Sequence, residues 1–238
     1  MRALTIVTCL VLGLCLTSCI KMDQSKEVKE ASLSSQEVKT SETTESRIPG
    51  WHGYNSSEIG PAWDFNEGVI SFDPARGKGG DIVSDEEYEN FELSLEWKIQ
   101  DCGNSGIFWN IVETEEFPYP WLTGPEMQVL DNKCHPDAKI TTHRAGDLYD
   151  MIKTSVENVK PAGEWNSIKI KSMNSEVTFW QNGEQVVQFT MHDENWDKMV
   201  ADSKFKTMPA FGKAKKGRIG LQDHGDKVWF RNIELKSM

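Results

Sequence analysis

A strict alternation of apolar and polar side chains runs from Phe91 to Ile99, and it constrains the fold more than any other feature. Five apolar residues occupy every second position, and charged residues or serine separate them. A helix, with 3.6 residues per turn, would scatter these five side chains around its circumference. A strand places them all on one face. The segment is therefore predicted to be a strand with one face buried.

Several other segments carry strand signals, and turn residues separate them. They cover residues 106–112, 126–130, 168–171, 176–181, 184–189, 218–222 and 227–235. Asn182-Gly183 joins two of them and strongly indicates a tight hairpin. In the last segment the alternation changes phase, which predicts a β-bulge near Asn232. One short helix is expected over residues 193–202, entered at Asp193.

Many short strands with turns between them predict an all-β fold, either an antiparallel β-sandwich or a jelly roll. Residues 49–238 are expected to form one such domain, because the composition changes at Pro49 and all nine tryptophans lie from Trp51 onward. The formal net charge of −11 gives the chain no electrostatic reason to bind nucleic acid, so no such partner is expected.

The first 18 residues indicate the compartment. Arg2 is followed by an almost wholly apolar stretch that ends in Leu16-Thr17-Ser18-Cys19. This layout is typical of a secretory signal peptide over residues 1–18, and its end resembles the bacterial lipobox, in which the cysteine is lipidated. We therefore expect a lipoprotein anchored in the cell envelope, periplasmic or outer-membrane, through acyl chains on Cys19. The alternative is an ordinary cleaved signal with an unrelated cysteine.

Residues 19–48 are expected to form a flexible tether. The segment after Cys19 is rich in Ser, Thr, Glu, Lys and Gln and lacks aromatic residues, so it cannot bury enough apolar area to offset its ordering entropy. Cys102 and Cys134 are then the cysteines that remain in the folded part. The envelope permits disulfides, so these two either form a bridge or are unrelated thiols.

The predicted strand 126–130 carries polar side chains on one face. Glu126 and Gln128 share that face, and the apolar residues between them take the other. A concave sheet lined in this way can hold sugar hydroxyls, with Trp109 and Trp121 as candidate stacking platforms. The alternative is that the two polar side chains merely face solvent.

A loop over residues 143–150 combines His143, Arg144, Asp147 and Tyr149. Together they supply a base, a cation and hydrogen-bond donors, and histidine is the side chain most easily poised for proton transfer near neutral pH. Function often resides on loops held by a rigid scaffold. The loop is therefore a candidate active-site segment.

Two turns are weaker candidates. One covers residues 101–106 and contains Asn104 between two glycines, and the other covers residues 222–225 and contains His224. Both could be ordinary connections between strands. The chain has no Gly-x-Ser-x-Gly elbow, no phosphate-cradling loop and no His-Glu-x-x-His zinc motif.

With these residues in view, the sequence resembles the 3-keto-disaccharide hydrolase family over about residues 51–236. The resemblance rests on seven ordered motifs, at residues 103–107, 124–131, 135–137, 143–150, 160–166, 180–183 and 220–225. Members of that family are similar to concanavalin A-type lectin/glucanase sandwiches. The resemblance therefore implies the same fold class as the strand pattern.

The resemblance also implies a distinctive chemistry. A partner oxidoreductase makes a ketone at C3 of a glycoside, and the ketone acidifies the C2 hydrogen. A base removes that proton, the C1 leaving group departs by elimination, and water then adds, so the net change is hydrolysis. Such an enzyme needs one base, stabilisation of an enolate, and help for the leaving group.

Roles follow as hypotheses. His143 is expected to be the base, Asp147 to orient it or act in its place, and Arg144 to stabilise the enolate oxygen. Glu126 is expected to bind hydroxyls or to assist departure of the aglycone. The other residues expected to contact substrate are Gln128, Asn104, Trp109, Trp121, Tyr149 and His224.

Two alternatives remain open. One is a retaining glycosidase that uses Glu126 and Asp131 as its two carboxylates. The other is a sugar-binding module without activity, in which a calcium ion is held near Asp131, Asn132 and Asp137. Activity on unoxidised glycosides would favour the first, and glycan binding without turnover would favour the second.

Overall fold

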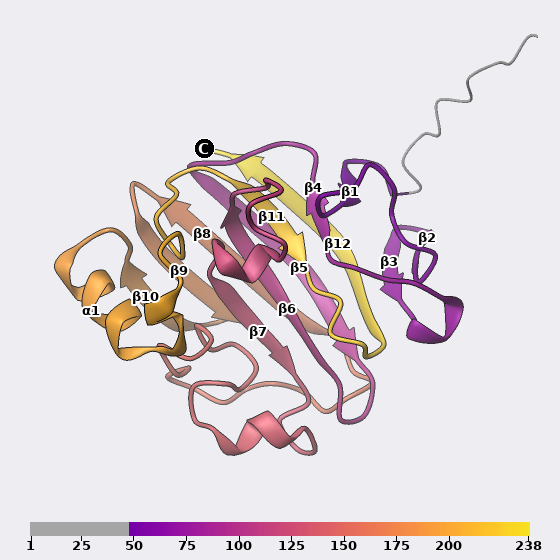
Figure 1. Ribbon diagram of the computed structural model, residues 1–238. Helices are drawn as coiled ribbons and strands as arrows, with labels where there is room; N and C mark the ends of the chain where they lie inside the picture. Colours follow the sequence, from indigo (N-terminus) through magenta and orange to yellow (C-terminus); the bar gives the residue numbers. More distant parts are fainter. Residues whose placement is uncertain (1–47) are drawn as a thin grey trace, which may run out of the picture. The chain divides into compact units, whose positions relative to one another are not determined.

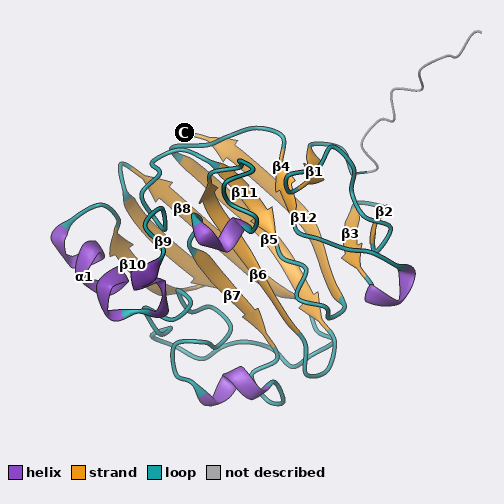
Figure 2. Cartoon of the chain, in the orientation of Figure 1, coloured by secondary structure: helices purple, strands orange, loops and turns teal. Residues whose placement is uncertain are grey.

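The computed structural model describes residues 48–238, which form two antiparallel β-sheets packed face to face (Figure 1, Figure 2). The expected signal peptide, Cys19 and almost all of the expected tether lie outside the described residues. Ile48 is the exception, and it is buried in the core at 1 % exposure. The folded domain therefore includes Ile48, one residue earlier than predicted.

One sheet has seven strands and forms the back of the sandwich in Figure 1. In spatial order these are β10 (Glu184–Thr190), β9 (Glu176–Gln181), β8 (Asn166–Met173), β5 (Phe91–Ile99), β12 (Val228–Ser237), β3 (Val69–Phe72) and β2 (Trp63–Asn66). All neighbouring strands are antiparallel. The all-β sandwich prediction is confirmed.

The other sheet has five strands and lies in front. Its order is β1 (Trp51–Gly53), β4 (Ile82–Ser84), β11 (Arg218–Leu221), β6 (Asn104–Ile111) and β7 (Glu126–Leu130). The helical elements are α1 (Glu194–Asp202) and the 3-10 turns η1 (Pro74–Arg76), η2 (Pro120–Leu122), η3 (Pro136–Lys139) and η4 (Lys204–Thr207).

The local sequence signals correspond closely to these elements. Strand β5 has its predicted bounds, and Asn182-Gly183 turns the hairpin between β9 and β10. The register of β12 against β5 shifts between Arg231 and Glu234, and Asn232 there has a φ of 52°, so the predicted bulge is confirmed. The Asp193 side chain accepts a hydrogen bond from the backbone N–H of Trp196 at 2.7 Å and caps α1 as expected.

The core lies between the sheets. The five apolar residues of β5 are each at most 2 % exposed, and Met127 and Val129 of β7 face them from the other sheet. Trp109 of β6 is fully buried in this core, with its ring centroid 5.4 Å from that of Phe179. The expectation that Trp109 stacks on a sugar is therefore wrong for this structure, because the strand alternation turns its ring inward. Within residues 48–238, no helix is long and apolar enough to cross a membrane.

Candidate active site

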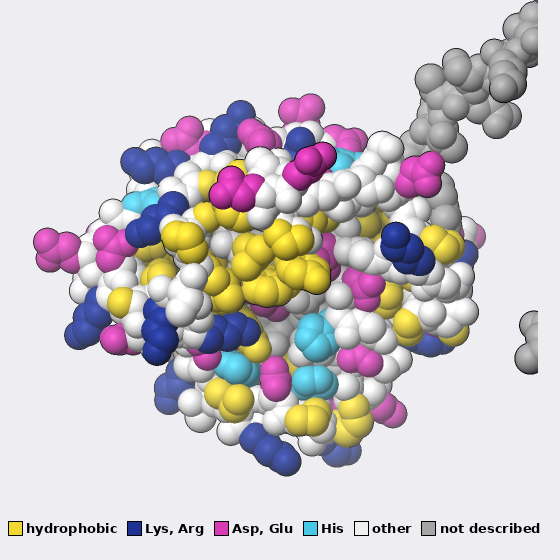
Figure 3. Space-filling view, viewed as in Figure 1, with side chains coloured by type: hydrophobic (Ala, Val, Ile, Leu, Met, Phe, Trp, Pro, Cys, Tyr) yellow, Lys and Arg dark blue, Asp and Glu magenta, His cyan; other side chains and the backbone are white. Residues whose placement is uncertain are grey.

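A cavity of about 710 Å³ opens on the outer face of the five-stranded sheet. Strand alternation creates it: residues 126 and 128 of β7 point outward because residues 127 and 129 point into the core. In the space-filling view, a group of hydrophobic side chains borders a hollow that shows histidine and acidic side chains (Figure 3). The lining residues are Tyr54, Gly80, Asp81, Asn104, Pro118, Tyr119, Trp121, Glu126, Gln128, Tyr149, Lys204, Phe205, Met208, Gln222, Asp223 and His224.

Glu126 lies at the floor of the cavity, directly over Gly106 of the neighbouring strand β6. The side chain is 7 % exposed. A Cβ atom added to Gly106 would overlap Glu126 Oε1 and would lie 2.7 Å from its Cδ. The absence of a side chain at residue 106 therefore gives the Glu126 carboxyl group its place.

The environment of Glu126 strongly favours its neutral form. Burial raises the pKa of Glu126 to about 8, and the negative charges of Asp81 and Asp137 add to the rise, while attraction to Lys204 opposes it. Within residues 48–238, no N–H or O–H group donates a hydrogen bond to this carboxyl group. A carboxylate formed here is poorly solvated, so it is a much stronger base than an exposed one.

Lys204 is the cation of the cavity. It begins η4, and its backbone N–H donates to Asp150 Oδ2 at 2.7 Å. Its Nζ lies 3.9 Å from the centre of the Tyr149 ring. Burial lowers the pKa of the Lys204 ammonium, and the charges of Glu126, Asp150 and Asp137 counteract this effect. The site therefore pairs a desolvated acid with a partly desolvated cation.

Two more carboxyl groups, those of Asp81 and Asp223, line the same cavity. Asp81 directly precedes β4 and Asp223 follows β11, and both of these strands are separated from β7 by β6 in the sheet. Asp81 Oδ1 accepts from the backbone N–H of Asp223 at 2.8 Å, and Asp223 Oδ2 accepts from the N–H of Gly80 at 2.7 Å. Burial raises the pKa of Asp81 to about 7, and the nearby charge of Asp223 contributes to the rise. These reciprocal bonds fix both side chains at the cavity wall.

The cavity also contains amide oxygens with no partner among residues 48–238. Asn104 Oδ1 and Gln222 Oε1 are buried and accept no hydrogen bond there. Asn104 Nδ2 lies 3.4 Å from His224 Nε2. A buried acceptor without a donor is costly, so these atoms are suited to hydroxyl groups of a ligand.

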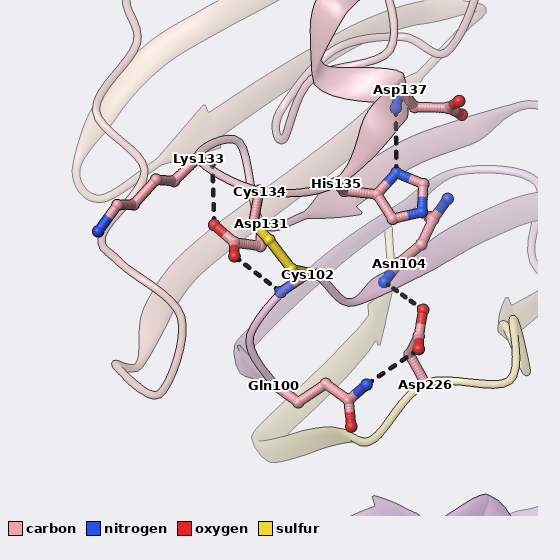
Figure 4. Close-up of a disulfide and its surroundings, with 9 residues drawn as sticks. All are labelled: Gln100, Cys102, Asn104, Asp131, Lys133, Cys134, His135, Asp137 and Asp226. Atoms are coloured by element: carbon pink, nitrogen blue, oxygen red, sulfur yellow. Dashed lines mark hydrogen bonds between the residues drawn. A yellow bond between two sulfur atoms is a disulfide. The ribbon is translucent and has the colours of Figure 1, made fainter.

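A disulfide between Cys102 and Cys134 supports this end of the cavity (Figure 4). It joins the turn between β5 and β6 to the loop after β7. Asn104, two residues beyond the bridge, is held further by a hydrogen bond from its backbone N–H to Asp226 Oδ2 at 3.0 Å. Of the two alternatives for these cysteines, the bridge is thus the one observed.

The three residues predicted as metal ligands are not brought together. Asp131 accepts backbone N–H groups on both carboxylate oxygens, and Asn132 Oδ1 accepts from the N–H of Ala145 at 2.8 Å. Asp137 lies elsewhere, beside Tyr149. Within residues 48–238, the one group of possible metal ligands is Cys102, Asp131 and Cys134, and its two sulfurs form the disulfide.

The loop over residues 143–150 runs along the outer edge of β7. The N–H of Tyr149 donates to the carbonyl of Glu126 at 3.0 Å, and the N–H of Gln128 donates to the carbonyl of Asp147 at 3.1 Å. The loop therefore adjoins the strand that displays Glu126, as the catalytic hypothesis required. Of its four candidate residues, Tyr149 is the one that lines the cavity.

His143 lies behind Tyr149 rather than in the cavity. The two ring centroids are 4.2 Å apart, and His143 Nε2 is 2.9 Å from Asp150 Oδ1. On the other side of the ring, Nδ1 is 3.5 Å from Asp137 Oδ2. The structure thus gives His143 the position of a supporting residue, one contact away from the cavity.

Arg144 and Asp147 are also engaged within the protein. Arg144 donates to the carbonyl of Ala138 at 2.8 Å and to Glu157 at 2.7 Å. Asp147 is fully buried and accepts from the backbone N–H groups of Arg144 and Thr154 at 2.7 and 2.6 Å. Neither side chain lines the cavity, so the structure does not support the expected direct contact with a ligand.

Sequence reasoning missed several residues of the cavity. Lys204 and Asp81 are the two with clear chemical potential, and each lies in a short connection without strand or helix periodicity. The Gly79-Gly80 pair before Asp81 was a local sign of a close backbone approach. Lys204 has no comparable signal, because its position depends on the packing of η4. The other missed lining residues are Tyr54, Gly80, Pro118, Tyr119, Phe205 and Met208. Gln222 and Asp223 also line the cavity, and they belong to the turn over residues 222–225 that the sequence indicated as a weaker candidate.

His143→Ala is expected to lower turnover of the enzyme's substrate by about tenfold or less, and to lower the free energy of unfolding by about 1–2 kcal/mol. The substitution frees Asp150 from His143, and Asp150 also holds the backbone of Lys204. Because His143 does not line the cavity, the pH dependence of kcat/KM should keep its shape. A loss of about a thousandfold, together with the loss of the rise in kcat/KM with increasing pH, would instead identify His143 as the base.

Comparison with known proteins resolves the family. The sequence model of a family described as the 3-keto-alpha-glucoside-1,2-lyase-like domain matches residues 44–236. The chain belongs to this family. The family recognised from seven sequence motifs is thereby confirmed.

Two proteins that are similar to this chain agree with the assignment to the lyase-like family. A protein of Bacteroides thetaiotaomicron named 3-keto-disaccharide hydrolase is 37 % identical over 214 residues, which cover 79 % of this chain and 74 % of that protein. A crystal structure from Parabacteroides distasonis, described provisionally as a glycosyl hydrolase, has a TM-score of 0.75 and 30 % identity, and covers 81 % of this chain and 90 % of the other. These comparisons identify the chain as a carbohydrate hydrolase.

A second Parabacteroides distasonis structure with a similar description supports the fold alone. Its TM-score is 0.60 and its identity is 24 %, with 79 % of this chain and 99 % of the other covered. The two-sheet architecture is therefore shared with both of these solved structures.

Proposed function

We propose that the protein cleaves 3-keto-glycosides by removing the C2 proton and expelling the C1 leaving group, with net addition of water. The observation that carries this proposal is the position and environment of Glu126. It is a carboxyl group at the floor of a sugar-sized cavity, desolvated, without a hydrogen-bond donor among residues 48–238, and with Lys204 as its neighbouring cation.

Glu126 is the base in this proposal. A ketone at C3 acidifies the hydrogen at C2, so one strong base within reach is sufficient to remove it. His143 does not reach the cavity, whereas Glu126 lines it. The raised pKa of about 8 matches the carboxylate to a carbon acid better than an ordinary glutamate would.

Lys204 takes the role that the sequence suggested for Arg144. When the C2–H bond breaks, its electron pair forms a C2–C3 double bond and the ketone oxygen becomes an enolate oxygen. A cation in a site with little water stabilises that charge far more than it would in bulk solvent. Lys204 lines the cavity, and burial by the cavity wall lowers the pKa of its ammonium group, whereas Arg144 is held outside the cavity by Glu157.

The remaining steps pass the electron pair of the enolate to the leaving group and return a proton to C2. The enolate re-forms the ketone, a double bond forms between C1 and C2, and the C1–O bond breaks toward the leaving group, which takes a proton from Glu126 or water. Water then adds its oxygen to C1 and a proton to C2. The product is a free 3-keto sugar, so elimination followed by hydration equals hydrolysis. The lyase named in the family description corresponds to the first half of this sequence.

Neutral amides provide contacts to the sugar ring. Asn104 and Gln222 each have a buried oxygen without a partner among residues 48–238, and Gln128 lies beside Glu126 on β7. Such groups bind hydroxyls without adding charge near the enolate. They therefore favour binding of the substrate without opposing the developing negative charge.

The two alternatives from the sequence can be weighed against the same geometry. A retaining mechanism that uses Glu126 and Asp131 needs both carboxyl groups beside one glycosidic bond. Asp131 instead accepts the N–H groups of Cys102 and Lys133 and does not line the cavity. A sugar-binding module would bind the same ligands without converting them.

The decisive experiment is incubation in D₂O with a 3-keto-disaccharide and with its unoxidised parent, with and without a chelator, followed by mass analysis. Elimination and hydration should place one deuterium at C2 of the released 3-keto sugar, beyond the exchange seen without enzyme. The unoxidised parent should remain intact. Cleavage of the parent, or release without deuterium at C2, would overturn the proposal, and binding without turnover would indicate the module.

The cellular setting is part of the proposal. The substrate requires a dehydrogenase that oxidises C3 of a glycoside, so such an enzyme should act before this one. We also propose that the protein works at the cell envelope through a lipid on Cys19. That part is based on the sequence alone, because Cys19 lies outside the described residues.

A further inference from the structure

Two aromatic rings form a stack at the border of the cavity. Tyr119 and Trp121 lie with ring centroids 5.1 Å apart and an angle of 8° between their planes, and both line the cavity. Trp121 packs against the apolar cluster of Val83, Phe108 and Ile111 on the outer face of the sheet. Tyr119 is 52 % exposed. A large aromatic surface is thus anchored to the sheet on one side and open to solvent on the other.

The segment that carries these rings is rigid. Proline residues at 118 and 120 flank Tyr119 and fix the backbone on both sides. The carbonyl of Phe117 accepts from Tyr54 Oη at 2.7 Å and from Asn55 Nδ2 at 3.0 Å. A ligand that binds here therefore orders little additional chain, and pre-organisation of this kind favours affinity.

The cavity is divided by polarity. Its most deeply buried polar side chains are Glu126, Asn104 and Gln128, which are 7, 2 and 1 % exposed. Besides the stacked pair, the apolar side chains of Pro118, Phe205 and Met208 line the cavity. The hydrophobic group beside the hollow in Figure 3 reflects this division.

The chemistry decides which part of a substrate takes which end. The C2 hydrogen must reach Glu126, so the keto sugar occupies the polar floor. The C1 leaving group must then extend away from the floor toward solvent, where the aromatic pair lies. A second sugar could lay one apolar ring face on the pair, but it would direct some of its hydroxyls at apolar side chains. An aryl ring would stack on the pair over its whole face and leave no polar group unpaired.

We propose that the stacked Tyr119–Trp121 pair is the aglycone site and that it selects leaving groups with an aromatic ring. This inference rests on the proposed function and adds a substrate class to it: 3-keto-glucosides of aryl-bearing alcohols. Tyr119 supplies the exposed face, and Trp121 holds Tyr119 in position by stacking beneath it. The phenol hydroxyl of Tyr119 is not required.

The test compares kcat/KM for the 3-keto-α-glucosides of 2-phenylethanol and methanol. Both leaving groups are simple alcohols of similar acidity, so the ratio of the two values reports contacts with the aglycone rather than bond breaking. The wild type should prefer the phenylethyl substrate by about tenfold, and Tyr119→Ala should reduce this preference by about fivefold. Tyr119→Phe should retain it.

Control variants separate contact from general damage. Phe65→Ala removes another exposed aromatic ring, on β2 and outside the cavity lining, and should leave the ratio unchanged. Trp121→Ala should reduce the ratio as Tyr119→Ala does, and a ratio within one preparation cancels any loss of folded protein. An unchanged ratio in Tyr119→Ala would overturn the inference.

A binding measurement keeps this inference separate from the proposed function. If the wild type cleaves neither substrate, the proposed function fails. Calorimetric titration with unoxidised 2-phenylethyl α-glucoside then decides the aglycone site, since binding needs no ketone. Weaker binding to Tyr119→Ala than to Tyr119→Phe would support the site, and equal binding would exclude it.

Discussion

Glu126→Gln is expected to lower kcat/KM for a 3-keto-glycoside by about a thousandfold or more, because the amide cannot accept the C2 proton. Glutamine has nearly the same shape, so sugar binding at the floor of the cavity should persist. In the wild type, kcat/KM should rise with pH and level off above about 8, where Glu126 loses its proton. The residual rate of the variant should lack this rise.

The same substitution should stabilise the folded protein at high pH. The pKa of Glu126 is about 8 in the folded state and near 4.5 in an unfolded chain. The stability contributed by this group is therefore fully present below pH 4.5 and is lost as the pH rises to 8. Glutamine carries no proton to lose, so the variant should gain on the order of 2–4 kcal/mol relative to the wild type at pH 9.

Both effects can be measured on one set of proteins. Initial rates from pH 5 to 10 give the first, and denaturant unfolding at pH 5 and pH 9 gives the second. Glu234→Gln makes the same chemical change at an exposed position of β12 and should alter neither. If the Glu126→Gln variant kept activity within tenfold of the wild type and its kcat/KM still rose with pH, Glu126 would not be the base.

Gly106→Ala is expected to reduce kcat/KM by about a hundredfold while the protein remains folded. The new methyl group would occupy the space of Glu126 Oε1, so the carboxyl group must swing away from the C2 hydrogen. A displacement of about 1 Å at a reacting group can cost a hundredfold in rate. Residue 106 does not have a positive φ, so alanine is compatible with the backbone of β6.

Gly220→Ala is the matched control for this steric effect. Gly220 pairs with Phe108 across β11 and β6, and a methyl group there would meet the end of the Ile111 side chain rather than Glu126. It should therefore reduce stability more than activity. If the two alanine variants lost activity equally per folded molecule, the link between Gly106 and the position of Glu126 would be contradicted.

The elements with a clear local period could be predicted from sequence. The alternation over Phe91–Ile99 predicted both the bounds and the buried face of β5, and the same rule placed Glu126 and Gln128 on the outer face of β7. Strands β1 to β4 were not predicted, because three or four residues are too few to show a period. They form only because neighbouring strands complete their hydrogen bonds.

The density of polar residues over 143–150 correctly indicated a segment beside the site but not which side chains act there. Backbone N–H groups in a tight loop need acceptors, and Asp147 provides them for Arg144 and Thr154. His143 is likewise paired with Asp150. A sequence shows that a side chain is capable of catalysis, but not whether its polar atoms are already paired within the fold.

The sequence by itself determined the fold class, the strand faces and the family, since period and motif order are properties of the local chain. Only the tertiary structure decided the chemistry of the cavity. Asp81, Glu126 and Lys204 come from distant segments, and their proximity follows from the order of strands in the sheet and from the packing of η4. The pKa of Glu126 also depends on burial by those segments, because desolvation is a property of the assembled site rather than of the residue.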